Sequence, residues 1–193
     1  MKFLFTSILV LIAFLAVACH AQEQTKEPLA KQIVKAAKFR TTQTVRYDPK
    51  YVVLDYPNGD VPADTGVCTD VVIRSLRAVG IDLQQKVHDD MKGNFYLYPK
   101  KWGLKQPDKN IDHRRVPNLQ TYFKRKGYEI QPGKSGERDF QPGDIVAWDL
   151  NDKGLTHVGI VVGKDIFVHN IGSGPVKDTG IDKWTILGHY RLK

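Results

Sequence analysis

Three side chains in this 193-residue sequence have the chemistry of a thiol nucleophile with its base. Cys68 lies in the stretch TGVCTDVVIRSL, directly ahead of a run with helical spacing. The start of a helix stabilises a thiolate, because the exposed N–H groups and the positive end of the dipole lie there. His157 begins the run HVGIVV, and His169 follows 12 residues later in IFVHN. A cysteine nucleophile needs a base and a third group that orients it, so we expect His157 to be base and acid and His169 the orienting residue.

The alternative is that Cys68 is an inert, buried cysteine that packs as a small hydrophobic side chain. The sequence contains 2 cysteines, and the other one, Cys19, lies in the N-terminal stretch. If that stretch is removed on export, Cys68 has no partner, whereas oxidising compartments normally pair their thiols. An unpaired cysteine in an exported chain indicates a reactive thiol.

Residues 1–21 have the order of a secretory signal peptide: a basic residue, an apolar stretch and small residues near a cleavage site. The apolar stretch is shorter than the roughly 20 residues of a spanning helix, although a retained anchor stays an alternative. Cleavage after Ala21 predicts a soluble exported protein, periplasmic or secreted. Cleavage after Ala18 would place Cys19 first, where a bacterial lipid anchor attaches. Of the two cleaved forms, only this lipoprotein would be held at a membrane.

The composition fits one globular domain over residues 27–193. Hydrophobic residues make up 41% and charged residues 26%, which is ordinary for a packed domain. The net charge of +8 favours anionic partners such as acidic cell-wall polymers. No arginine-rich tract accompanies it, so we expect no nucleic-acid partner. The sequence leaves the oligomeric state open.

The periodicity changes along the chain from helical to alternating. Helical spacing predicts four helices, and runs of β-branched residues between turn residues predict four antiparallel strands. The predicted helices cover residues 27–40, 68–79, 83–92 and 119–127, and the predicted strands cover residues 144–150, 157–164, 166–172 and 186–193. Helices followed by strands is the order of an α+β domain. A hairpin of the second and third strands would bring His157 and His169 to one end or face of the sheet.

The motifs DFQPGDIVAW, HVGIVV and IFVHN, within residues 139–174, resemble the NlpC-type branch of papain-like cysteine peptidases and amidases. That branch places a Pro-Gly-Asp turn before one strand, His-Val-Gly-Ile at the start of the next, and a histidine in the third. The stretches TGVCTDVVIRSLRAVGIDLQ, NIDHRRVPNL and HNIGSG resemble more closely an exported bacterial family, domain of unknown function 1287. This likeness spans about residues 30–193.

The resemblance implies a papain-like fold in which N-terminal helices carry the nucleophile and pack on a C-terminal antiparallel sheet. It also implies attack on an amide bond through an acyl-enzyme, with Cys68 as nucleophile and His157 and His169 in the roles given above. Asn170 is a rival for the third role, because papain uses Asn there. The Cys68 backbone N–H would hold the oxyanion. We expect no cofactor and no metal, since no spaced ligand set appears.

Two departures concern the substrate. The branch has Asp-Cys-Ser around its nucleophile, whereas this chain has Val67-Cys68-Thr69, with an acid at Asp70 instead. The chain also carries an inserted stretch with Asp112, His113, Arg114 and Arg115. With Asp70, these residues are candidates for substrate binding, because Arg binds carboxylates bidentately and a muramyl peptide offers such groups. The alternative is a loop whose arginines pair with the protein's own acids.

Three classes of function fit these observations. The first is a Cys-His-His amidase or peptidase that acts on peptidoglycan-like peptide. The second is a non-catalytic wall-binding module on the same fold, which predicts a buried and unreactive Cys68. The third is a cysteine acyltransferase, because an acyl-enzyme can pass its acyl group to an acceptor other than water.

Overall fold

The computed structural model describes residues 27–134 and 136–193, so the predicted signal peptide and Cys19 lie outside the described residues. The helices are α1 (Leu29–Arg40), α2 (Cys68–Arg77), α3 (Leu83–Asn94) and α4 (Val116–Arg125), with the 3-10 turns η1 (Phe95–Leu97) and η2 (Asp112–Arg114). The strands are β1 (Arg46–Tyr47), β2 (Thr65–Gly66), β3 (Ile145–Asp149), β4 (Thr156–Gly163), β5 (Ile166–Asn170), β6 (Pro175–Thr179) and β7 (Thr185–Tyr190).

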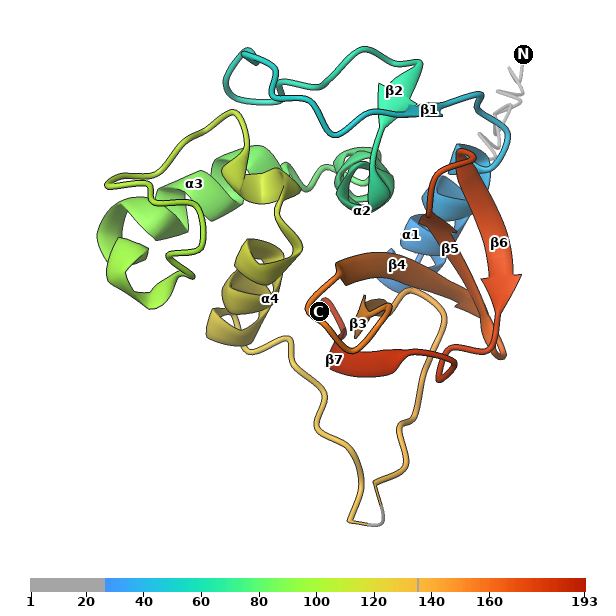
Figure 1. The fold of residues 1–193 in the computed structure, drawn as a ribbon. Coiled ribbons are helices and arrows are strands. Elements are labelled where there is room, and N and C mark those ends of the chain that lie inside the picture. Colours follow the sequence, from blue (N-terminus) through green and yellow to red (C-terminus); the bar gives the residue numbers. More distant parts are fainter. Residues whose placement is uncertain (1–26, 135) are drawn as a thin grey trace, which may run out of the picture.

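The helices precede the main sheet along the chain, which confirms the predicted α+β class. The main sheet is antiparallel, with the strand order β6-β5-β4-β3-β7. Strands β1 and β2 form a separate parallel ribbon next to the start of α2. Helix α2 lies in the middle of the molecule, between the sheet on one side and α3 and α4 on the other (Figure 1).

Helix α2 is the central element of the core. Every residue from Cys68 to Leu76 is buried, which is expected of a helix covered on all sides. Its first turn is fixed by Asp70, whose carboxylate accepts the Val67 N–H at 2.7 Å. It ends before Gly80, which has a φ of 84° and so takes the left-handed conformation that terminates helices.

The two faces of the sheet bury different clusters. One face packs its aliphatic side chains against the helices in the main core, with Val158 and Ile160 of β4 among them. The opposite face carries a smaller aromatic cluster around Trp148 and Phe167. Side chains alternate along a strand, so His157 lies on the aromatic face, where its ring centroid is 6.0 Å from that of Trp148.

Strand β6 is the one strand of the sheet that the hydrophobic pattern did not predict. Its sequence, PVKDT, is polar and begins with Pro175. It is an edge strand, where a proline at the first position costs no ladder hydrogen bond, and one partner strand is enough to hold it. The strand matters for function because it carries Asp178.

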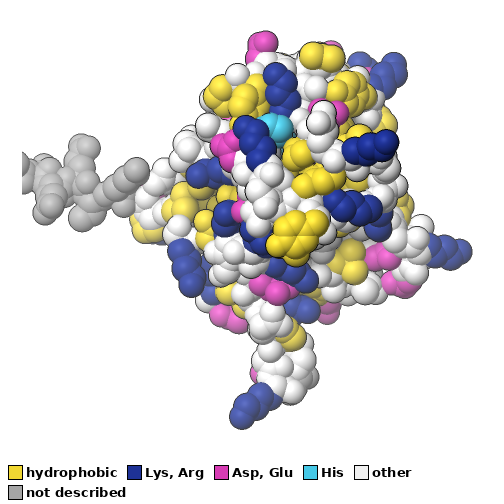
Figure 2. Space-filling model, turned by 90° about the vertical axis from the view of Figure 1, so that its left-hand side faces the viewer, with side chains coloured by type: hydrophobic (Ala, Val, Ile, Leu, Met, Phe, Trp, Pro, Cys, Tyr) yellow, Lys and Arg dark blue, Asp and Glu magenta, His cyan; other side chains and the backbone are white. Residues whose placement is uncertain are grey.

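One face of the molecule mixes charges of both signs. On the face to which α3 belongs, basic, acidic and hydrophobic side chains are interspersed rather than separated (Figure 2). Over residues 27–134 and 136–193, the structure has no helix with both the length and the apolar character that a membrane crossing requires.

Candidate active site

The Cys68 backbone is held in place by a buried ion pair behind it. Asp70, one turn into α2, receives two hydrogen bonds from Arg114, Nε to Oδ1 at 3.0 Å and Nη2 to Oδ2 at 2.9 Å. The Arg114 side chain is 2% exposed. Such a bidentate pair is directional as well as charged. It ties η2 to the first turn of α2 and so fixes where the thiol stands.

The Cys68 thiol is protonated at rest. The residue is 6% exposed, and burial, with a smaller effect from the Asp70 carboxylate, raises the pKa of the thiol to about 12. The backbone N–H of Val158 lies against the sulfur and opposes this rise. Val158 follows His157 in strand β4, but Val158 and Cys68 belong to the main core whereas His157 lies on the aromatic face. The thiol and the predicted base therefore belong to opposite faces of the sheet.

The two predicted histidines are in direct contact. His157 Nε2 and His169 Nδ1 are 2.8 Å apart across the neighbouring strands β4 and β5, and both residues are buried. On the far side of His169, its Nε2 lies 3.3 Å from Asp178 Oδ2, which is a long contact rather than an ideal hydrogen bond. Lys183 pairs with the same carboxylate. The sequence predicted the pair but not Asp178.

The Asp178 carboxylate favours one tautomer for each ring. A carboxylate only accepts hydrogen bonds, so its negative charge, 3.3 Å away, stabilises a proton on His169 Nε2. In that tautomer His169 Nδ1 is a lone pair, to which His157 Nε2 donates its proton, and Nδ1 of His157 is unprotonated. An unprotonated nitrogen is what a base for the thiol requires.

Both imidazoles are neutral at rest. Burial, and to a smaller extent the neighbouring His169 and Lys183, lower the pKa of His157 to about 3. Burial also lowers the pKa of His169, although Asp178 opposes the change. Within the described residues, no hydrogen bond joins the Cys68 thiol to either ring. The resting site therefore holds a neutral thiol and a neutral base rather than an ion pair.

Asn170, the rival third residue, is bonded elsewhere. Its side-chain amide donates to the Gly66 carbonyl at 3.3 Å, and its side-chain oxygen accepts the Gly172 N–H at 3.1 Å. It lies next to His169 on β5 but its side chain points to the opposite face of the sheet. The contact ties β5 to the segment that leads into Cys68.

The candidate substrate-binding residues of the inserted stretch have partners within the protein. His113 is buried beside Arg114, and burial lowers the pKa of its imidazole to about 3. Arg115 pairs with Asp112 at 3.1 Å and its guanidinium lies 4.1 Å from the centre of the Trp102 ring. Arg114 and Arg115 thus pair with the protein's own acids, which is the arrangement given above as the alternative to substrate binding.

A cleft of about 210 Å³ opens beside Cys68. Its walls include Tyr47 of the β1–β2 ribbon, Trp102, Arg115 and Thr156. Trp102 is 39% exposed, so an aromatic face and a cation are presented to whatever enters. Residue type and spacing do not single out Tyr47 or Thr156, because only the fold brings them to the cleft beside the thiol.

The described residues hold no group of three or more His, Cys, Asp or Glu side chains arranged as a metal site would need. His88, Asp89 and Asp90, adjacent in sequence, have separate contacts. Asp89 accepts from Tyr56, and Asp90 is buried and bonded to Arg125 and Lys126.

A family model described as "Domain of unknown function (DUF1287)" matches residues 34–192. The chain belongs to this family. That confirms the family predicted from the motifs. The DUF1287 chain is 49% identical over 165 residues to the uncharacterized protein YijF of Escherichia coli (strain K12), an alignment that covers 82% of this chain and 80% of YijF.

Two solved structures are similar to this chain at low sequence identity. They are NlpC1 and NlpC2 from Trichomonas vaginalis, each 15% identical, with TM-scores of 0.49 and 0.47. The matches cover 88% of the DUF1287 chain but only 46% and 48% of the two neighbours. The chain thus spans about half the length of these solved structures.

Proposed function

We propose that this DUF1287 protein is an exported cysteine hydrolase that cleaves an amide bond in cell-wall peptide. One observation carries the proposal. The Cys68 thiol, at the first residue of α2, lies against Val158, the residue that follows His157 in β4, and the His157–His169 pair on the other face of the sheet ends on a carboxylate. Nucleophile, base and orienting group are the three parts that thiol catalysis needs.

The chemistry follows from the tautomers. With substrate bound, the thiol and the His157 ring have to meet at the start of β4. His157 Nδ1 then accepts the thiol proton as the sulfur attacks the carbonyl carbon, and the Cys68 backbone N–H donates to the oxyanion that forms. The amide C–N bond then breaks, and His157 returns the proton to the leaving amine. Water, deprotonated by the same nitrogen, attacks the thioester and releases the acid and the free thiol. Asp178 favours the doubly protonated His157 through His169, because its charge is opposite.

Activation has to be coupled to substrate binding. Burial disfavours both a thiolate and an imidazolium, and the resting thiol has no hydrogen bond to His157 within the described chain. Hydrogen bonds of this kind are often long in a free enzyme and shorten in the substrate complex. We therefore place proton transfer in the same step as sulfur attack, rather than before it.

The cleft favours an extended peptide with an anionic group. Trp102 and Tyr47 offer flat apolar walls to the peptide, and Arg115, whose charge is paired with Asp112, stacks on Trp102 at the same cleft. The attraction for an anionic group therefore comes from the charge of the whole chain. The net charge of +8 attracts acidic polymers. Export, which rests on the signal-like residues 1–21, would bring the protein to the cell wall.

The rival proposal is a wall-binding module without catalysis, and the burial of Cys68 favours it. A thiol that is 6% exposed and has a pKa of about 12 has the properties of a packing residue. The two proposals differ in the effect of replacing Cys68. In the hydrolase, catalysis would be lost. In the wall-binding module, only the packing around residue 68 would change.

The deciding experiment digests purified peptidoglycan with residues 22–193 and with the Cys68→Ala variant, and reads released fragments by mass spectrometry. An Arg46→Gln variant, changed at an exposed ion pair, serves as the matched control. We expect new amide-cleavage products from the wild type and the control, and none from Cys68→Ala. An added amine acceptor that appears in the products would indicate an acyltransferase instead.

Absence of products from all three proteins, together with a Cys68 thiol that resists iodoacetamide in the folded state, would contradict the hydrolase. Sacculus binding by the same preparations would then support the wall-binding module. Products from Cys68→Ala equal to those of the wild type would also overturn the thiol mechanism.

A further inference from the structure

A second and larger cavity lies on the other side of the segment that leads into Cys68. Its volume is about 420 Å³, within the range of small-molecule sites. The end of α1, the outer turns of α2 and the loop around Val61 surround it, and Gly66, Val67 and Asn170 close one side. Val67 lines this cavity and the Cys68 cleft alike, so the two are neighbours separated by one stretch of backbone.

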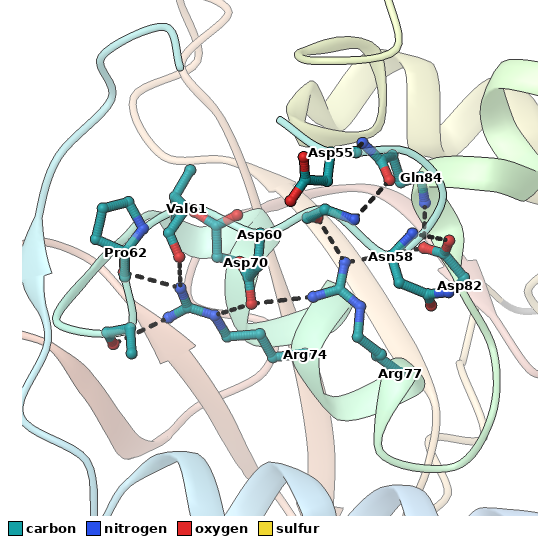
Figure 3. A network of polar contacts seen from close by, with 12 residues as sticks. Asp55, Asn58, Asp60, Val61, Pro62, Asp70, Arg74, Arg77, Asp82 and Gln84 are labelled. Atoms are coloured by element: carbon teal, nitrogen blue, oxygen red, sulfur yellow. Dashed lines mark hydrogen bonds and ion pairs between the residues drawn. The ribbon is translucent and has the colours of Figure 1, made fainter. Parts of the chain in front are cut away.

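Three guanidinium groups face this cavity: Arg40, Arg74 and Arg77. Arg74 and Arg77 share the carboxylate of Asp60, each at 2.9 Å (Figure 3). A second carboxylate, that of Asp82, has its Oδ1 3.8 Å from Arg77 Nη2. The acid Asp70 also lines the cavity, but Arg114 neutralises it. The balance of these charges is positive.

Arg74 is saturated by its own surroundings. Besides Asp60, it donates to the backbone carbonyls of Val61 and Pro62 at 3.1 and 3.2 Å. It therefore holds the loop against α2 and supplies a fixed positive charge, with little donor capacity left for a ligand.

Arg40 is the cation without a partner. Within the part of the chain that the structure describes, its guanidinium makes no ion pair and no hydrogen bond, and it stacks only on the adjacent Phe39 ring, at 4.8 Å. Its Nε is buried and unsatisfied. A donor that is removed from water without a partner costs free energy. Burial and the nearby Arg74 lower the pKa of Arg40, and the Asp60 carboxylate offsets this only in part. An anion in the cavity would remove both penalties.

We propose that this cavity binds a small molecule through an oxyanion group, a carboxylate or a phosphate, with Arg40 as the donor and Arg74 and Arg77 as supporting charges. Arg40 presents a planar fork of N–H groups, which matches either oxyanion. The site is separate from the Cys68 cleft and does not depend on catalysis there.

Calorimetric titration of residues 22–193 at constant ionic strength tests the proposal, with inorganic phosphate and glutarate as separate probes. The same titrations use Arg40→Gln, which removes the charge, and Lys38→Gln, which removes an exposed charge on the same helix outside the cavity. Thermal unfolding of each variant checks that it is folded. Because Arg40 has no partner to lose, we expect Arg40→Gln to remain as stable as the wild type.

The expected result is saturable binding of at least one probe to the wild type and to Lys38→Gln, weakened at least about 10-fold in Arg40→Gln, since a charge-assisted bidentate contact is lost. Binding of phosphate alone or of glutarate alone identifies which oxyanion the cavity accepts. Saturable binding of neither probe, or equal binding by Arg40→Gln and the wild type, overturns the proposal. A Cys68→Ala variant should bind as the wild type does, whatever its activity on peptidoglycan.

Discussion

At the scale of single residues, Asp178 favours, through His169, the tautomer of His157 that is protonated at Nε2. Asp178 belongs to β6, the edge strand that the hydrophobic pattern did not predict, and its carboxylate contacts His169 from there. Its role is to position other groups, since it touches His169 and not the thiol. Partners of this kind that orient a functional histidine have effects of about 10- to 100-fold in metal sites.

We expect Asp178→Asn to lower kcat by about 10- to 100-fold with little change in KM, because the amide can accept or donate and no longer fixes the ring tautomers. Nitrogen NMR of the imidazoles gives a direct readout: Nε2–H tautomers for both rings in the wild type and a mixture in the variant. Asp152→Asn, an exposed acid on another loop, is the control. Unchanged tautomers in Asp178→Asn would contradict the positioning role.

The neutral resting thiol gives a second prediction, about pH. Because burial raises the pKa of Cys68 to about 12, its thiolate fraction should keep rising through the alkaline range instead of levelling off near neutrality. Alkylation of the folded protein by iodoacetamide should therefore accelerate continuously from pH 6 to pH 10. The extent of alkylation is measured by mass spectrometry of the intact protein. A plateau in the rate below about pH 7 would instead reveal a preformed thiolate–imidazolium pair.

At the scale of elements, the first turn of α2 depends on an interaction 44 residues away in sequence. Arg114 of η2 neutralises Asp70, and both side chains are almost fully buried. Breaking a buried pair leaves an uncompensated charge, which costs about 3–5 kcal/mol, whereas an exposed pair contributes about 0–1 kcal/mol.

Arg114→Gln should accordingly lower the free energy of unfolding by about 3–5 kcal/mol, measured by urea denaturation at pH 7. Arg46→Gln breaks an exposed pair with Asp48 and should change the free energy of unfolding by less than about 1 kcal/mol. If the two variants were equally stable, Arg114 would not be what holds the start of α2.

The elements that local patterns define were predictable. Leu76 and Val72 lie on one helical face of α2, and Gly80 ends it, so the helix follows from spacing and a stop signal. The β-branched runs of β3, β4, β5 and β7 likewise indicate strands. Strand β6 was not predictable because its polar sequence has no hydrophobic signal and depends on pairing with β5.

The site was predictable only in part, for a similar reason. Residue type and spacing singled out Cys68, His157 and His169, and a hairpin explains why the two rings meet. The pairing of Arg114 with Asp70 and the arrival of Asp178 at His169 are long-range contacts with no local signature. Chemistry-bearing residues can thus be found from sequence, whereas the groups that tune them depend on the tertiary fold.

At the scale of the whole molecule, buried carboxylates paired with basic side chains tie distant segments together. Asp144 binds His189 and Arg191, and so joins the turn before β3 to the end of the chain. Asp90 of α3 binds Arg125 and Lys126 at the end of α4, and also accepts from Tyr98. These acids make stability depend on pH, because their ionised forms are the ones that bind.

Asp90 gives the clearest case. Burial opposes its ionisation, but hydrogen bonds from Arg125, Lys126 and Tyr98 outweigh this and lower its pKa to about 2. A carboxyl whose pKa is depressed by folding stabilises the protein above its unfolded pKa, and that contribution is lost as the pH falls through the folded pKa. For Asp90 the contribution is about 2 kcal/mol, present in full at pH 5 and lost progressively between about pH 4 and pH 2.

Asp90→Asn should therefore be about 2 kcal/mol less stable than the wild type at pH 7, and the difference should shrink as both are acidified toward pH 2. Urea denaturation at several pH values measures both effects. Asp89→Asn, changed at the exposed neighbour on the same helix, should show neither the loss of stability nor its pH dependence, because the Asp89 carboxylate is solvated. A difference between Asp90→Asn and the wild type that stayed constant from pH 5 to pH 2 would mean that packing, not the charge of Asp90, joins α3 to α4.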